Sequence, residues 1–79
     1  MTTLTKILDV CTAFSFAHPY YRFSLVHEGE TTTVECYSGE NLHKLIIGSV
    51  VVQGGTVIIN DGHDSSLRDY LEKHGFRTN

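Results

Sequence analysis

Five histidines stand in a chain of 79 residues, and His63 lies between Asp61 and Asp64 in the segment Asp-Gly-His-Asp. Imidazole and carboxylate groups bind zinc and exchange protons, so this segment is the first candidate for metal or acid–base chemistry. No HxxxH, HExxH or CxxC pair is present to supply two ligands from one element. A polar turn followed by an acidic helix cap explains the same residues, and we predict no metal, no cofactor and no catalytic residue.

Two further groups have the residue types needed for nucleophilic or phosphate chemistry. Cys11 and Cys36 are the only cysteines, and both fall on faces predicted to point inward, whereas a reactive thiolate needs an exposed, electropositive setting. Ser38-Gly39 and Asp64-Ser65-Ser66 each precede a predicted helix, where free amides bind phosphate. Neither matches GxxxxGKS/T or GxGxxG, and an acid at Glu40 or Asp64 would repel the anion. We therefore predict helix capping at both places and expect no enzyme.

Composition narrows the function classes further. The net charge of −3 argues against a duplex DNA binder that acts through counterion release. A hydrophobic fraction of 41% with 10% aromatic residues is typical of a folded domain rather than a disordered chain. No signal peptide and no apolar stretch of about 18 residues occurs, so we expect a cytoplasmic protein with no membrane contact, in the host cytoplasm if phage-encoded.

The clearest structural signal is a hairpin in which residues 49–53 and 56–60 are joined by Gly54-Gly55. Two glycines supply the positive φ angles of a type I′ or II′ turn. One face of this hairpin is then wholly apolar and belongs to the core: Val50, Val52, Val57 and Ile59. The other face is polar except for Val51 and Ile58, which lie opposite each other.

Residues 20–37 alternate with period two and predict an earlier hairpin with its turn at Glu28-Gly29. Its predicted core face carries Tyr21, Phe23, Leu25, Thr32, Val34 and Cys36. On the opposite face this register places Tyr20 across from Tyr37 and Arg22 across from Glu35. Val26 shares that face.

Helical spacing predicts three helices around these hairpins. The first is capped by Thr2 or Thr3, runs for about three turns and ends before Ala17-His18-Pro19. Its predicted inner face carries Leu4, Ile7, Leu8, Cys11 and Phe14. A short helix follows Ser38 and is closed by Gly48, with the alternative left open that residues 43–47 extend the next strand.

The final helix is predicted to begin at Asp64 or Ser65 and to end in a Schellman motif at Gly75 and Phe76. Its predicted inner face carries Leu67, Tyr70, Leu71 and His74. The resulting class is α+β, with the order α-ββα-ββα and a four-stranded antiparallel sheet that has its helices packed on one face. We expect a single domain, 1–79, with two ββα units at 20–48 and 49–75 after the N-terminal helix.

The open sheet face is the predicted binding surface, and the expected partner-binding residues are Tyr20, Arg22, Val26, Tyr37, Val51 and Ile58. Exposed apolar patches with polar rims mark interaction surfaces, and tyrosine and arginine are favoured anchors there. We therefore expect a small non-enzymatic protein-binding module that acts as an inhibitor or regulatory subunit by surface occlusion. A homodimer is the commonest way to cover such a patch.

The alternative function is weak single-stranded nucleic-acid binding, with Tyr20, Tyr37 and Arg22 as a stacking platform. No RNP signature is present, and the acidic charge disfavours a nucleic-acid partner. In size and charge alone, the chain is similar to inhibitors made by phages and mobile elements, anti-CRISPR proteins among them. Such inhibitors occlude a basic groove, for which the available acidic residues are Glu28, Glu30, Asp61, Asp64, Asp69 and Glu72.

Overall fold

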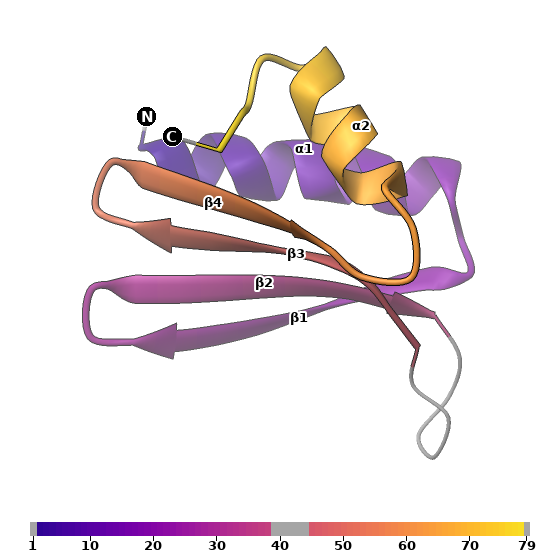
Figure 1. The fold of residues 1–79 in the computed structure, drawn as a ribbon, viewed down its shortest axis with the longest axis horizontal. Coiled ribbons are helices and arrows are strands. Elements are labelled where there is room, and N and C mark those ends of the chain that lie inside the picture. Colours follow the sequence, from indigo (N-terminus) through magenta and orange to yellow (C-terminus); the bar gives the residue numbers. More distant parts are fainter. Residues whose placement is uncertain (1, 39–44, 79) are drawn as a thin grey trace.

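The computed structural model describes residues 2–38 and 45–78. Its elements are α1 (Thr3–Ala17), β1 (Tyr21–Glu28), β2 (Thr31–Ser38), β3 (Leu45–Gln53), β4 (Thr56–Asp61) and α2 (Ser66–Lys73). The strands form one antiparallel sheet in the order β1-β2-β3-β4, and both helices lie on the same side of it (Figure 1). The predicted α+β class and the four-stranded antiparallel sheet with helices on one face are confirmed.

Local capping explains where α1 begins and ends. The Oγ1 atom of Thr2 accepts a hydrogen bond from the Thr5 amide at 3.2 Å, as an N-cap side chain does. The helix extends over 15 residues and includes Ala17, so it is longer than predicted. It ends at His18, because Pro19 disfavours helical geometry in the residue before it.

The ends of α2 follow the predicted pattern. At its start, Oδ1 of Asp64 accepts from the Ser66 amide at 2.9 Å. At its end, Gly75 has a φ of 92°, and the amide of Phe76 donates to the carbonyl of Leu71 at 2.9 Å. This is a Schellman motif, as predicted. His74 is exposed rather than part of the inner face, and its ring lies 4.7 Å from that of Tyr70.

The register of the β3–β4 hairpin is confirmed, including the Val51–Ile58 pair. The β1–β2 register differs from the prediction because the turn lies one residue later, at Gly29-Glu30. Gly29 has a φ of 59° while Glu30 has no positive φ, which is the type II′ geometry that places glycine first. Moving the turn by one residue shifts the pairing by two, so each side chain keeps its predicted face while its cross-strand partner changes.

The apolar segment before Ser49 belongs to a strand and not to the predicted helix. Residues 45–48 form the start of β3, and the expected boundary between two ββα units therefore falls inside this strand. The remaining residues of that predicted helix, 39–44, lie outside the described residues. Cys36 pairs with Gly48 whereas Tyr37 pairs with Ile46, so Ile47 is the extra residue of a β-bulge. Gly48 does not end a helix, since it lies beneath α2, where an added Cβ would be 3.3 Å from Leu67 Cβ.

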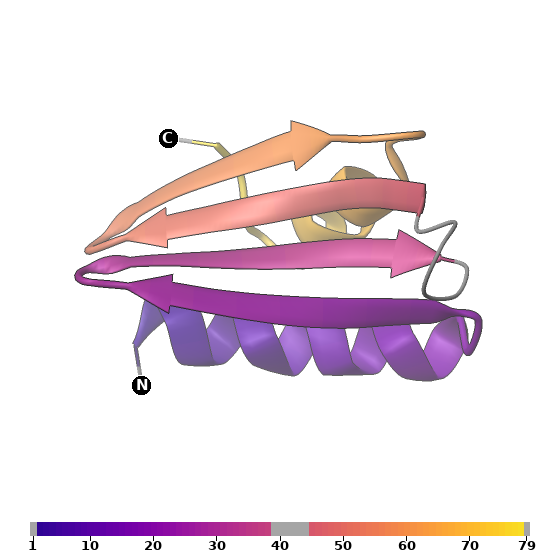
Figure 2. The ribbon, with the colours of Figure 1, turned by 90° about the horizontal axis from the view of Figure 1, so that it is seen from below.

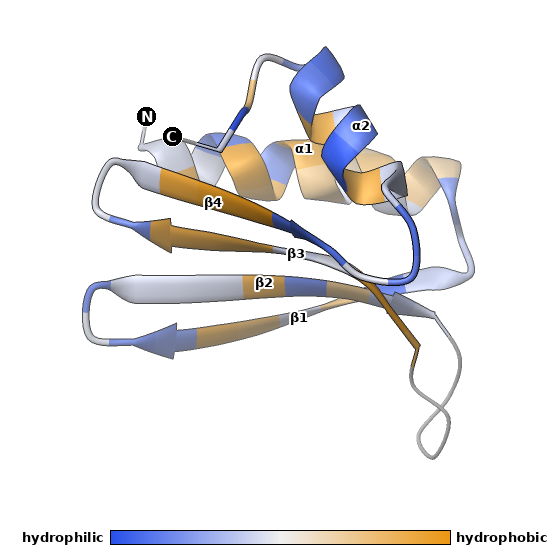
Figure 3. Cartoon of the chain, in the orientation of Figure 1, coloured by the Kyte–Doolittle hydropathy of each residue, from blue (hydrophilic) through white to orange (hydrophobic). Residues whose placement is uncertain are grey.

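The core fills the space between the sheet and the two helices. Figure 3 shows the largely apolar β3 and β4 on the side where α2 lies, and α2 contacts both strands. The buried residues are Ile7, Cys11, Phe14, Val34, Cys36, Ile47, Val50, Val52, Val57, Ile59, Leu67 and Leu71. Leu25, which was predicted to be in the core, lies on the correct face but is 54% exposed because β1 is an edge strand.

Candidate functional site

No described helix covers the face of the sheet opposite α1 and α2, and Figure 2 views the sheet from this side. The pairings Val26–Thr33, Thr33–Val51 and Val51–Ile58 connect one residue from each strand. We call these four residues the apolar row: Val26, Thr33, Val51 and Ile58. Val26 is 47% exposed and Ile58 is 40% exposed, while the two central members are half-buried. Three of the six predicted partner-binding residues are thus brought together in a single line across the sheet.

The other three predicted residues do not assemble as expected. Arg22 lies opposite Tyr37, four residues along the strands from the apolar row, and Ile46 continues this pairing on β3. Tyr20 precedes β1 and is 86% exposed, so it does not face Tyr37 across a strand pair. The predicted Tyr20–Tyr37 and Arg22–Glu35 pairs are therefore wrong, because both depended on a turn at Glu28-Gly29.

The Asp-Gly-His-Asp segment leads from the end of β4 toward α2, and it is hydrogen-bonded both to α2 and to β3. Nε of Arg68 donates to Oδ1 of Asp61 at 2.8 Å, and this bond raises the pKa of the guanidinium. The amides of Gly62 and His63 donate to the carbonyls of Ile47 and Ile46 at 2.9 and 2.8 Å. The backbone amide and the side chain of Ser66 hydrogen-bond to the carboxylate of Asp64, which precedes the N-cap residue Ser65, and these bonds lower the pKa of that carboxyl group.

Both thiols are buried, as predicted. Cys11 is 3% exposed and Cys36 is 0% exposed. Burial raises the pKa of Cys11 to about 12 and that of Cys36 to about 11. Repulsion from the Cys36 thiolate adds to the shift at Cys11, and repulsion from the Asp64 carboxylate adds to the shift at Cys36. Such thiols stay protonated at neutral pH, so the geometry offers no activated nucleophile at either position. Within the described ranges, no group of three His, Cys, Asp or Glu residues is placed to hold a metal ion.

Four of the six acidic residues available for an inhibitory surface lie in two separate places. Glu28 ends β1 and Glu30 lies in the turn that follows it, whereas Asp61 ends β4 and Asp64 lies in the connection from β4 to α2. Figure 1 shows these two connections at opposite ends of the sheet. A single basic groove would have to span the length of the molecule to contact both pairs.

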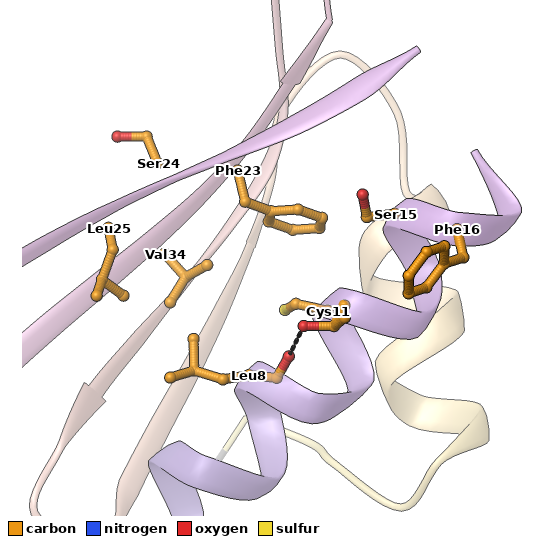
Figure 4. A pocket seen from close by; sticks show the side chains of 9 residues that line it. Leu8, Cys11, Ser15, Phe16, Phe23, Ser24, Leu25 and Val34 are labelled. Atoms are coloured by element: carbon orange, nitrogen blue, oxygen red, sulfur yellow. Dashed lines mark hydrogen bonds between the residues drawn. The ribbon is translucent and has the colours of Figure 1, made fainter. Parts of the chain in front are cut away.

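A second surface, which the sequence reasoning did not identify, lies between α1 and β1. This α1–β1 groove has a volume of about 310 Å³ and is lined mainly by Leu8, Cys11, Phe16, Phe23, Leu25 and Val34. Figure 4 shows Phe23 extending from the strand toward the helix, with Phe16 on the helix side. The ring of Phe14 packs α1 against β1, since its centroid lies 6.1 Å from that of Phe23 and 5.6 Å from that of Tyr21.

The walls of the α1–β1 groove are unusually exposed for apolar side chains. Phe16 is 84% exposed and Leu25 is 54% exposed. The sequence contained one signal for this surface, because Phe16 stands away from the inner face of an otherwise amphipathic helix. The groove itself had no local signal, since it depends on where α1 crosses the sheet.

No protein-family model matches the chain, and comparisons with curated proteins and with solved structures likewise found no match. Among the described helices, none is both long and apolar enough to cross a membrane.

Proposed function

We propose that the protein is a small non-enzymatic binding module that docks another protein on the bare face of its sheet. The observation that carries this proposal is the apolar row, which crosses all four strands at one level. Its neighbours on one side are polar: Ser24, Glu35, Ser49 and Asn60. Its neighbours on the other side are also polar: Glu28, Thr31, Gln53 and Thr56. An exposed apolar strip with a polar rim is the surface chemistry of interaction sites.

The mode of action that fits such a surface is occlusion, as an inhibitor or a regulatory subunit. A flat sheet face offers no enclosed volume for a substrate, but it covers the surface of a partner efficiently. Arg22 and Tyr37, which pair with each other on the same face four residues from the row, are the residue types that anchor protein interfaces. A second copy of the chain is one such partner, since a twofold axis through the row would bury the same residues of both copies.

The proposal extends to the biological origin of the module and to the kind of target it inhibits. Small size and acidic charge favour an inhibitor of the kind that phages and mobile elements encode, including anti-CRISPR proteins, acting in the cytoplasm. This comparison rests on size and charge alone. The nucleic-acid alternative loses its stacking platform, because Tyr37 pairs with Arg22 and not with Tyr20.

The test uses two variants on the same strand and face. Val51→Glu places a charge in the centre of the apolar row, whereas Gln53→Glu places the same charge at an exposed rim position. We expect Val51→Glu to abolish capture of a partner from a lysate, or self-association measured by light scattering, while Gln53→Glu retains it. Circular dichroism checks that both variants are folded. Equal behaviour of the two variants, or salt-sensitive binding of labelled oligonucleotides by the wild type, would overturn the proposal.

A further inference from the structure

Each edge strand of the sheet has backbone amides and carbonyls that point away from its neighbouring strand. The two edges differ in whether these groups are hydrogen-bonded. At the β4 edge, the amide of Ile59 donates to Oγ1 of Thr78 at 2.8 Å. The carbonyl of Ile59 accepts from Nη2 of Arg68 at 2.6 Å. The C-terminal segment and α2 therefore close this edge, as natural sheets protect their edges against other chains.

The β1 edge has no equivalent cover in the part of the chain that the structure describes. Because Glu28 and Thr31 flank a two-residue turn, they form a hydrogen-bonded pair, and the even-numbered residues of β1 bond to β2. The amides and carbonyls of Phe23, Leu25 and His27 then point away from the sheet. No hydrogen bond within the described residues occupies these groups. β1 also has no proline, no lysine and no bulge to block pairing.

The α1–β1 groove lies beside these unpaired backbone groups. Phe23 and Leu25 belong to both features, since their backbones form the open edge and their side chains line the groove. An added strand would place alternate side chains on this face of the sheet, because side chains in a strand alternate between faces. Those side chains would cover Phe16 and Leu25, the exposed walls of the groove.

We propose that the β1 edge and the α1–β1 groove together bind an extended segment of another protein. The segment pairs with β1 as a fifth strand, and its alternate apolar side chains enter the groove. On the opposite face of β1, Arg22 and Glu28 lie near the two ends of the strand. An antiparallel segment with an acidic residue opposite Arg22 and a basic residue opposite Glu28 complements both charges.

A second copy of this chain does not fit at the β1 edge. A twofold axis between two β1 strands would place both α1 helices on the same face of one continuous sheet. Figure 2 shows α1 along the outer side of β1, and its principal strand contact is β1. Paired strands lie about 4.8 Å apart, whereas packed helices need about 8–10 Å between their axes. The two helices would collide, while a lone strand has no such helix.

A designed peptide tests this proposal with the full-length protein. The probe is fluorescein-labelled Lys-Val-Thr-Leu-Thr-Val-Glu, which places its three apolar residues opposite Phe23, Leu25 and His27 when it pairs antiparallel with β1. We expect saturable binding by fluorescence anisotropy. N-methylation of the three apolar residues keeps their side chains but removes the amides that would bond to β1, and we expect it to weaken binding at least tenfold. Exchanging the Lys and Glu of the peptide should weaken binding several-fold.

Protein variants and amide exchange locate the peptide. Leu25→Asp and Phe16→Ser change exposed side chains, so both should fold and should bind the peptide at least tenfold more weakly. Leu45→Ser, which changes an exposed apolar side chain at the start of β3, is the matched control and should bind within twofold of the wild type. In NMR exchange experiments, the peptide should slow exchange of the Leu25 amide at least tenfold and leave that of Ile59 unchanged.

Four results would overturn the proposal: no binding of the probe, equal binding of the N-methylated peptide, protection at β4 instead of β1, or a free protein that is already a dimer with protected β1 amides. Equal binding of the methylated peptide would mean that the groove takes apolar groups without strand pairing. The apolar row is not involved in these measurements. Its Val51→Glu test can therefore fail while this proposal stands, and the reverse also holds.

Discussion

The division of the sheet into a core face and an open face predicts opposite effects for one substitution at adjacent positions. Val50 is 0% exposed and pairs with Val34 and Ile59, both buried, whereas Val51 is half-buried on the open face. Threonine has nearly the shape of valine and is also β-branched, so Val50→Thr and Val51→Thr preserve strand propensity. The two variants differ in whether the new hydroxyl reaches water.

The expected magnitude follows from this burial. Val50→Thr removes one buried methyl group, about 0.8 kcal/mol, and buries a hydroxyl among apolar side chains, about 1–3 kcal/mol. The sum is about 2–4 kcal/mol, a large part of the roughly 4–12 kcal/mol expected for a domain of this size. The melting temperature should fall by roughly 8–30 °C. For Val51→Thr, we expect a change within about 0.5 kcal/mol.

Urea and thermal unfolding followed by circular dichroism at pH 7 measure both variants. The slope of free energy against urea concentration should be unchanged, which shows that the folded state is equally compact in each case. Equal destabilisation by the two substitutions would refute the face assignment. A larger effect at Val51 would mean that the register of β3 is displaced by one residue.

Three further predictions concern close packing, ionisation and the β4 edge. Gly62→Ala should destabilise the fold by about 1–3 kcal/mol in urea unfolding, because an added Cβ would lie 2.8 Å from the Ile47 carbonyl carbon, whereas Gly55→Ala, with open space around it, should not destabilise it. The thiols ionise near pH 9.0 when unfolded but only at about pH 11 to 12 when buried, so stability should fall as pH rises above 9, by about 1.4 kcal/mol per pH unit for each thiol. A Cys11→Ala/Cys36→Ala variant should lose that part of the slope in urea titrations between pH 8 and 10.5. Arg68→Ala removes the hydrogen bond to the carbonyl of Ile59 at the β4 edge, so the variant should associate with increasing concentration in light scattering. A strictly monomeric variant would contradict this account of edge protection.

The two hairpins illustrate how far turn chemistry specifies register. Gly54-Gly55 leaves one sensible position for a two-residue turn, and every predicted pair of β3 and β4 forms. The first hairpin has only Gly29 between acidic residues, and the turn is possible with glycine in either central position. The structure places glycine first, with a φ of 59°. Period-two alternation still assigned the faces correctly, because a shift of two residues leaves them unchanged.

Residues 45–48 show the limit of local pattern. The segment Leu-Ile-Ile-Gly is apolar throughout, so it fits a buried strand as well as the end of a short helix. Pairing with both β2 and β4 decides in favour of the strand, and the bulge at Ile47 lets consecutive residues 47 and 48 both face the core. These contacts are distant in sequence, and no local signal reports them.

The sequence by itself determined the cap that begins α1, the Schellman end of α2, the Gly54-Gly55 turn, the sheet class and the two faces of each predicted strand, because caps, glycine φ angles and period-two alternation act within a few residues. It also placed Val51 and Ile58 opposite each other on the open face. Only the tertiary structure decided that Val26 and Thr33 continue this pair into a row, that Tyr20 stands apart from it, and that α1 lies along β1 and leaves a groove. Those outcomes depend on strand order and on the position of a helix across a sheet, which are set by long-range packing.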